Sequence, residues 1–193
     1  MARADDRIPD REVVESQFQK AVRKHDILRA LIITAGVLIT VSVAATITAS
    51  LFVQIFRIEG SSMADTLREG DLVLVIDDLY FGKGDIIACR YEDDVLVKRI
   101  IATGGDVVDI EADGTVVVNG SPLEESYITE KALGSCSIAL PCRVPDGENF
   151  VMGDHRTVSI DSRNAAIGCI DDNEIIGKVI FRIWPVRGVG TVE

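Results

Sequence analysis

Two hydrophobic patterns divide this chain. From Ala30 to Phe56 the sequence carries no charged residue over 27 positions and is rich in Leu, Ile, Val and Ala. About 20 apolar residues suffice to cross the hydrocarbon core of a bilayer, whereas the apolar stretch of a cleavable signal peptide has only ~7–15. A helix buried in a globular protein normally keeps a polar face. The pattern therefore predicts a transmembrane helix over residues 27–56.

The remainder of the chain shows short apolar runs separated by Gly and Asp. Several of these runs alternate apolar with polar residues and are rich in β-branched side chains, which indicates β-strands. Asp113-Gly114 and Asn119-Gly120 flank one run, as expected for the tight turns of hairpins. The expected strands are Leu72–Ile76, Asp85–Ala88, Val95–Ala102, Val107–Ile110, Thr115–Val118, Phe150–Met152 and Lys178–Ile183. The predicted fold class is mainly β, with one N-terminal helix.

The charged residues predict how the chain is placed across a membrane. The expected segments are a polar segment at residues 1–26, the span at 27–56 and a β-rich domain at 57–193. Arg23, Lys24 and Arg29 come just before the uncharged run, whereas Arg57 is the only basic residue just after it. Because basic residues favour the cytoplasmic side, we expect a cytoplasmic N-terminus and an extracytoplasmic β-rich domain.

The net charge of the β-rich domain limits its partners. Residues 57–193 hold 13 Lys/Arg against 25 Asp/Glu, a net charge of about −12. A surface of this sign repels the phosphate backbone. The composition therefore argues against a nucleic-acid partner.

Four cysteines suit an extracytoplasmic domain. Cys136 and Cys142 lie six positions apart in a loop containing Gly, Ser and Pro, where an oxidising compartment favours a small loop disulfide. The alternative is two ordinary small residues in a loop. Cys89 and Cys169 lie in apolar segments and are expected to be buried. Neither pair has the spacing of metal ligands, and we expect no metal or organic cofactor.

A Gly/Ser-rich stretch, Gly60–Leu67, follows the predicted span and contains the candidate nucleophile Ser62. Such a stretch forms a turn for purely local reasons, and a short helical turn is expected after Asp65. A serine is a poor nucleophile unless a base removes its proton. On the same side of the predicted span, the candidate bases are His155 and Lys98.

Lys98 and Arg99 interrupt an otherwise apolar strand. Their side chains point to opposite faces, so one of them faces the buried side. Burial would lower the lysine pKa from ~10.4 and make the neutral amine available as a base. The ordinary alternative is a lysine that extends to solvent or forms a salt bridge.

A third stretch, Gly153–Arg163, is dense in hydroxyl, carboxylate and guanidinium groups between two apolar segments. It could be a solvated loop with an Asp–Arg pair. The alternative is a supporting layer that fixes a nearby catalytic amine through hydrogen bonds.

Taken together, these stretches resemble the type I signal peptidase family, bacterial membrane serine proteases with a Ser/Lys dyad. The matching stretches are Ser62–Leu67, Gly84–Ile86, Val97–Ile101 with Gly105-Asp106, Met152–Arg156, Ser159–Arg163, Gly177–Val179 and Trp184-Pro185. One such motif would be weak evidence, but several in the family's order behind an apolar segment are specific. The single span and Gly60 look more like the Gram-positive subgroup.

This resemblance implies a mechanism and roles for individual residues. Ser62 would be the nucleophile, Lys98 the general base and Ser159 the hydroxyl that orients the lysine amine. Further residues implied are Asp154, Arg156, Asp161 and Arg163 as structural support, and Gly60, Ser61 and Met63 at the substrate. The implied partners are the lipid bilayer and the signal peptides of secretory preproteins, cut after small residues. The implied catalytic domain is a partly open β-barrel.

One departure from the family pattern lies beside the predicted nucleophile. Asp65 stands where the family usually has Pro, and its carboxylate could approach Lys98 and raise the lysine pKa, or cap the helical turn. This keeps an alternative open: a catalytically inert, membrane-tethered β-module that serves as an assembly chaperone for surface proteins. A soluble, DNA-linked Ser/Lys protease of the self-cleaving repressor type is disfavoured by the apolar span and the acidic domain.

Overall fold

The N-terminal part of the chain is one long helix. The computed structural model describes residues 11–77 and 80–192, and the chain divides into two compact units, residues 1–49 and 50–193. Helix α1, Arg11–Phe52, contains a 22-residue apolar stretch, Asp26–Ile47, with a mean hydropathy of 2.3. That length suffices for a single membrane span. The first ten residues of the predicted N-terminal segment lie outside the described residues.

The structure corrects the expected end of the membrane helix. Helix α1 stops at Phe52, and strand β1, Val53–Arg57, pairs antiparallel with β2, Leu72–Ile76. The two strands align in register from Val53 opposite Ile76 to Arg57 opposite Leu72. The uncharged run is therefore shared between a helix and a strand, because pairing with β2 decides the conformation of its last residues. Apolar content alone does not separate the two states.

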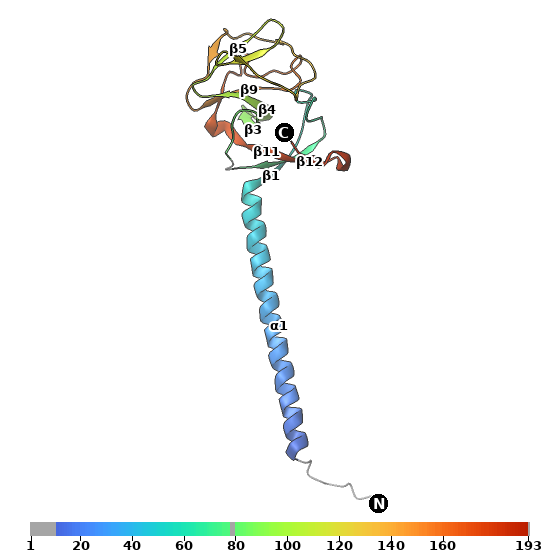
Figure 1. Cartoon of the computed structure of the whole chain (residues 1–193). Helices are drawn as coiled ribbons and strands as arrows, with labels where there is room; N and C mark the ends of the chain where they lie inside the picture. The colour runs from blue at the N-terminus through green and yellow to red at the C-terminus, as the bar shows by residue number, and fades with distance from the viewer. Residues whose placement is uncertain (1–10, 78–79, 193) are drawn as a thin grey trace, which may run out of the picture. The chain divides into compact units, whose positions relative to one another are not determined.

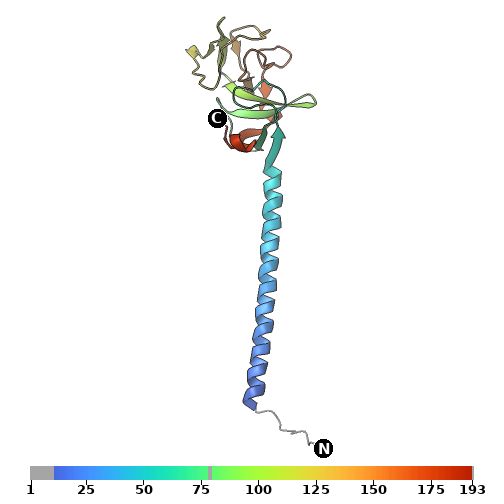
Figure 2. The same ribbon diagram turned by 90° about the vertical axis from the view of Figure 1, so that its right-hand side faces the viewer.

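Eight strands form the larger of two antiparallel sheets. Their order is β1-β2-β11-β3-β4-β9-β10, and β12 pairs with β11. The remaining bounds are Ile86–Tyr91 for β3, Asp94–Thr103 for β4, Glu148–Met152 for β9, Ile170–Asp171 for β10, Ile175–Trp184 for β11 and Gly190–Thr191 for β12. Two 3-10 helices, η1 at Asp172–Glu174 and η2 at Val186–Gly188, lie before and after β11. In Figure 2 the β3–β4 hairpin, drawn in green, projects from the side of the domain.

A smaller sheet has the order β7-β6-β5-β8. Its strands are Val107–Ile110 for β5, Val116–Val118 for β6, Ser121–Pro122 for β7 and Cys142–Arg143 for β8. Figure 1 shows this sheet, labelled at β5, above β9 and β4 of the larger sheet. Asn119 and Gly120 both have positive φ and join β6 to β7, which confirms the predicted tight turn.

The core positions the stretch around Ser62. Met63 and Leu67 are buried in one hydrophobic cluster with Val73 and Val75 of β2. A second cluster lies between the two sheets and includes Phe150 of β9. The two buried side chains of the Gly/Ser stretch therefore anchor it to the core beside β2.

The mainly β fold with one N-terminal helix is confirmed, and both sheets are open, with β1 and β10 at the ends of the larger one. The expected disulfide is not formed, since all four cysteines are free thiols. Cys142 lies in β8 opposite Val108, whereas Ser137, the residue after Cys136, bonds through its backbone to Arg163. Cys89 is buried as expected, and Cys169 is partly buried.

Candidate active site

Residues 60–67, here called the Ser62 turn, connect β1 to the segment before β2. Gly60 has a φ of +76°, a conformation that glycine adopts without steric cost. The backbone N–H of Leu67 donates to Met63 at 2.6 Å, which closes one helical turn. With Met63 and Leu67 buried and Ser62 half-buried, the turn is anchored on one side and presents its serine on the other.

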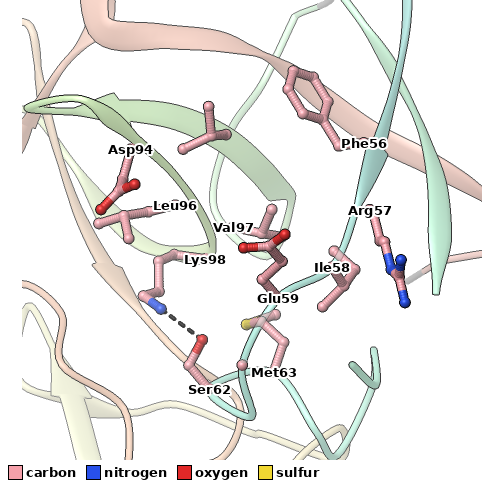
Figure 3. A pocket seen from close by; sticks show the side chains of 12 residues that line it. Phe56, Arg57, Ile58, Glu59, Ser62, Met63, Asp94, Leu96, Val97 and Lys98 are labelled. Atoms are coloured by element: carbon pink, nitrogen blue, oxygen red, sulfur yellow. Dashed lines mark hydrogen bonds between the residues drawn. The ribbon is translucent and has the colours of Figure 1, made fainter. Parts of the chain in front are cut away.

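Lys98 comes to Ser62 from the middle of β4. Only 3% of Lys98 and 2% of Arg99 is exposed. Both neighbouring side chains are therefore buried, whereas the sequence required only one of them to face the buried side. The Lys98 Nζ donates to the Ser62 Oγ at 2.7 Å (Figure 3). Within the described residues no carboxylate forms an ion pair with this amine. Burial lowers the Lys98 pKa below its ordinary value of 10.5, partly opposed by Asp161, which favours the neutral amine.

Arg99 and Asp154 join the strand of Lys98 to the Ser62 turn. The Arg99 Nε and Nη2 donate to the two carboxylate oxygens of Asp154 at 3.0 and 2.8 Å, the geometry in which a guanidinium fits a carboxylate best. Asp154 also accepts from the Thr66 Oγ1 at 2.5 Å. One buried carboxylate thus fixes both the base-bearing strand and the turn of the predicted nucleophile.

Glu125 and Tyr127 belong to the same buried cluster and are not among the residues singled out by the sequence. Glu125 forms a buried ion pair with Arg156, and the Tyr127 Oη donates to Glu125 at 2.8 Å. The Tyr127 ring centroid lies 3.9 Å from the Cζ of Arg99, a cation–π contact. Burial raises the Tyr127 pKa, so its hydroxyl stays protonated. The alternation and turn patterns of the sequence carry no signal for either residue.

Asp161 and Arg163 form a second bidentate pair. The Arg163 Nε and Nη2 each donate to Asp161 at 2.8 Å, and Asp161 accepts the Gly153 backbone N–H at 2.9 Å. Burial alone would raise the Asp161 pKa, but these hydrogen bonds and the Arg163 charge hold it below 3.8. The predicted Asp–Arg pair is therefore a buried brace and not a solvated loop.

Ser159 lies in this brace but is not bonded to the lysine. Its Oγ is buried and makes no hydrogen bond to the Lys98 amine, so its expected role in orienting Lys98 stays a prediction. A Cβ on Gly153 would collide with the Ser159 Oγ and with the Ser62 carbonyl. Glycine at position 153 therefore lets this loop pack directly on the Ser62 turn.

A cleft of about 510 Å³ opens beside Ser62 and Lys98. Figure 3 shows Phe56–Glu59 on one side and Asp94–Lys98 of β4 on the other. Of the predicted substrate-binding residues, Gly60 and Met63 line the cleft and Ser61 does not. Phe56 and Ile58 come from one wall of the cleft, and Leu96 and Val97 come from the other. Two walls of extended backbone with apolar side chains suit an extended peptide with small side chains.

His155, the alternative candidate base, and Asp65 form hydrogen bonds with groups other than the Ser62 Oγ and the Lys98 Nζ. The His155 Nδ1 lies 3.2 Å from the Ser61 carbonyl oxygen, and the His155 backbone N–H donates to the Ser62 carbonyl at 3.0 Å. Neither contact involves the Ser62 Oγ. Asp65 neither approaches Lys98 nor caps a helix. Its Oδ2 accepts the backbone N–H of Thr129 at 2.6 Å.

Comparison with known proteins identifies the family of this chain. The family model described as "Signal peptidase, peptidase S26" matches residues 30–184. Signal peptidase I of Bacillus licheniformis is 33% identical over 167 residues, which is 80% of this chain and 88% of that protein. Signal peptidase I T of Bacillus subtilis (strain 168) is 35% identical over 143 residues, covering 67% and 73%.

Two further similarities are to proteins of Staphylococcus aureus and Enterococcus faecalis. Signal peptidase IB of Staphylococcus aureus (strain N315) is 35% identical over 150 residues, or 67% of this chain and 77% of that protein. A crystal structure of a signal peptidase I from Enterococcus faecalis V583 is 27% identical, with a TM-score of 0.42, and covers 52% of this chain and 97% of that chain. The comparisons give no support to the inert assembly module. From the family match over residues 30–184 and these relatives, the chain belongs to the signal peptidase family, peptidase S26, serine endopeptidases that remove signal peptides.

Proposed function

We propose that Ser62 is the nucleophile and Lys98 the general base with which this signal peptidase cleaves exported preproteins. The observation that carries the proposal is the 2.7 Å contact between the Lys98 Nζ and the Ser62 Oγ, made by an amine whose pKa burial lowers. When the amine is neutral, the same contact lets the serine hydroxyl donate to nitrogen. A lysine can then do the work that a histidine does in other serine proteases.

The proposed reaction has two steps. In the first, Lys98 takes the Ser62 proton while the Oγ bonds to the scissile carbonyl carbon. The C–N bond then breaks, and Lys98 returns the proton to the leaving amine of the mature protein. In the second step, Lys98 deprotonates a water that attacks the acyl-enzyme. This attack releases the signal peptide with a free carboxylate and restores the Ser62 hydroxyl.

The negative charge that develops on the carbonyl oxygen needs a donor. We assign this role to the backbone N–H of Ser62, which no hydrogen bond to a described residue occupies. Gly60, two positions earlier, has no hydroxyl to add a second donor. A preorganised backbone donor stabilises such an oxyanion without reorganisation during the reaction.

The remaining residues support the dyad and the substrate. Asp154, Asp161 and Arg163 brace the Ser62 turn and the loop that packs on it, and Ser159 would orient the lysine amine. The cleft would hold the preprotein as an extended strand with small side chains one and three positions before the cut. Gly60, Ser61 and Met63 would lie along that strand.

The membrane topology belongs to the same proposal. The basic residues Arg23, Lys24 and Arg29 precede the uncharged run that begins at Ala30 and support a cytoplasmic N-terminus. Residues 57–193 would then act outside the cytoplasm on preproteins emerging from the same bilayer. Anchoring enzyme and substrate in one membrane raises their effective concentration.

The test is cleavage of a preprotein with Ala one and three positions before the cut, by the full-length protein in detergent. Wild type cleaves at the signal junction, and Ser62→Ala or Lys98→Ala lowers kcat/KM by about 10²–10⁴-fold or more. His155→Ala keeps most of the activity because only the His155 backbone contacts the Ser62 residue, and EDTA leaves the rate unchanged. The dyad is contradicted if Ser62→Ala cleaves the preprotein at the wild-type rate, or if His155→Ala and Lys98→Ala lower kcat/KM equally.

A further inference from the structure

The Ser62 turn is tied to a distant segment through Asp65. The Asp65 Oδ2 accepts the backbone N–H of Thr129 at 2.6 Å, across 64 positions of the chain. Thr129 belongs to residues 124–130, here called the strap, which follow β7 and contain no helix or strand. Type I signal peptidases usually carry a proline in the position of Asp65. The ring of a proline restricts its own φ, whereas an aspartate leaves the backbone unrestrained.

The strap is a firm attachment point. Glu125 forms a buried ion pair with Arg156, and the Tyr127 hydroxyl donates to Glu125. The Tyr127 ring packs 3.9 Å from the Arg99 Cζ. These contacts fix the middle of the strap against Arg156 and Arg99. The Thr129 N–H is therefore a donor of defined position. A hydrogen bond to it restrains the turn relative to the strand that carries the base.

The other contacts hold different parts of the turn. Thr66 bonds to Asp154, and the Ser62 carbonyl accepts from the His155 N–H. Between these two points, Asp65 is the exposed corner of the turn. The bond from its carboxylate to Thr129 restrains that corner from the side opposite the core.

We propose that Asp65 is a positioning residue: its carboxylate ties the Ser62 turn to the strap through Thr129 and holds the Ser62 Oγ against Lys98. This inference rests on the proposed role of Ser62. It predicts an effect on the chemical step, since the tether lies outside the residues that line the cleft.

The first comparison is between three replacements of Asp65, assayed on an internally quenched peptide with Ala one and three positions before the cut. Asp65→Ala lowers kcat about three- to tenfold with KM unchanged, the loss expected for one hydrogen bond made to a charged group at the surface. Asp65→Asn keeps an oxygen acceptor and restores most of kcat. Asp65→Pro restores it by restraining the backbone directly.

The second comparison removes the donor instead of the acceptor. Thr129→Pro lacks the backbone N–H and lowers kcat as Asp65→Ala does, whereas Thr129→Ala keeps the N–H and the activity. In the Asp65→Ala and Asp65→Pro backgrounds, Thr129→Pro has no further effect. Additive losses in the double variant would mean that the proline disturbs the strap by another route and would overturn the tether.

Ser62→Ala, measured beside these variants, separates the two proposals. If Ser62→Ala is inactive while Asp65→Ala has the wild-type kcat, the dyad stands and the tether is refuted. If Asp65→Ala raises KM at unchanged kcat, the carboxylate contacts substrate and does not position the serine. If Ser62→Ala remains active, the proposed nucleophile itself is wrong.

Discussion

Lys98 and Arg99 are neighbours on one strand and both are buried, yet their side chains are bonded to different kinds of group. Arg99 donates to both oxygens of Asp154 and to the Gly84 carbonyl, and it stacks on Tyr127. Lys98 has a single hydroxyl, that of Ser62, as its hydrogen-bond partner within the described residues. The cost of burying Arg99 as a cation is offset by a carboxylate, whereas the cost of burying Lys98 as a cation is not.

The difference teaches that burial alone does not decide whether a cation is structural or reactive. A guanidinium remains charged under all ordinary conditions, so it must bring its counter-ion into the core. An amine can respond to burial by losing its proton. Arg156 with Glu125 and Arg163 with Asp161 follow the Arg99 pattern. These three buried arginines each have a carboxylate partner, whereas Lys98 has no ion-pair partner among the described side chains.

The largest expected effect comes from replacing Lys98 by arginine, the residue type of its neighbour Arg99. Lys98→Arg places a group at the Ser62 Oγ that cannot accept a proton, so kcat/KM falls by about 10²–10⁴-fold. Wild-type kcat/KM rises with pH through an apparent pKa below 10.5, the direction in which burial shifts the lysine. Cleavage of a quenched peptide by both proteins as a function of pH measures this. A profile that is flat, or that inflects at or above 10.5, would be inconsistent with a lysine base.

The second effect comes from removing the charge that Arg99 supplies. Arg99→Leu leaves Asp154 buried without its guanidinium, and we expect a loss of about 3–5 kcal/mol in the free energy of unfolding. Urea unfolding of the detergent-solubilised protein measures the loss. The matched control is the double variant Arg99→Leu/Asp154→Leu, which should recover part of it because neither charge is then left alone. A single variant within about 0.5 kcal/mol of wild type would show that this pair does not brace the fold.

The smallest expected effect is on the free energy of unfolding, which burial of Lys98 lowers. Lys98→Met removes a buried polar group that lacks a counter-ion, and we expect a protein about 1 kcal/mol more stable near neutral pH. Because burial lowers the pKa of the folded state, the unfolded chain binds more protons, and wild-type stability rises with pH toward 10.5. The gap between the two proteins should therefore narrow as pH rises. A gap that is independent of pH would mean that the lysine charge is compensated in the fold.

Much of the fold follows from local pattern. The bounds of β2 and β5 agree with the predicted strands, and the Asn119-Gly120 turn lies where expected, because alternation and turn chemistry act within a few residues. Strand β1 was not predicted since its residues continue the uncharged run of α1. The two-residue strands, such as β7 and β8, are too short to show any alternation.

Some residues of the candidate site could be predicted from the sequence and others could not. Ser62 and Lys98 stand in recognisable motifs, so resemblance predicts their roles before any geometry is known. Glu125, Tyr127 and Thr129 stand in no motif, and their importance depends on a fold that brings them to Arg156, Arg99 and Asp65. The role expected of Asp65 was wrong because a side chain of this length can reach several partners. Tertiary packing chooses among them.

The sequence by itself determined the apolar helix and the strand-rich domain, and it predicted the two reactive groups, because each depends on residue type and spacing along the chain. Only the tertiary structure decided that Lys98 is buried beside the Ser62 hydroxyl and that no carboxylate among residues 11–77 and 80–192 forms an ion pair with it. The free energy of a charge depends on the surrounding solvent and counter-ions. Those surroundings are built by residues far apart in the chain, such as Thr66 and Asp154, which are hydrogen-bonded across 88 positions.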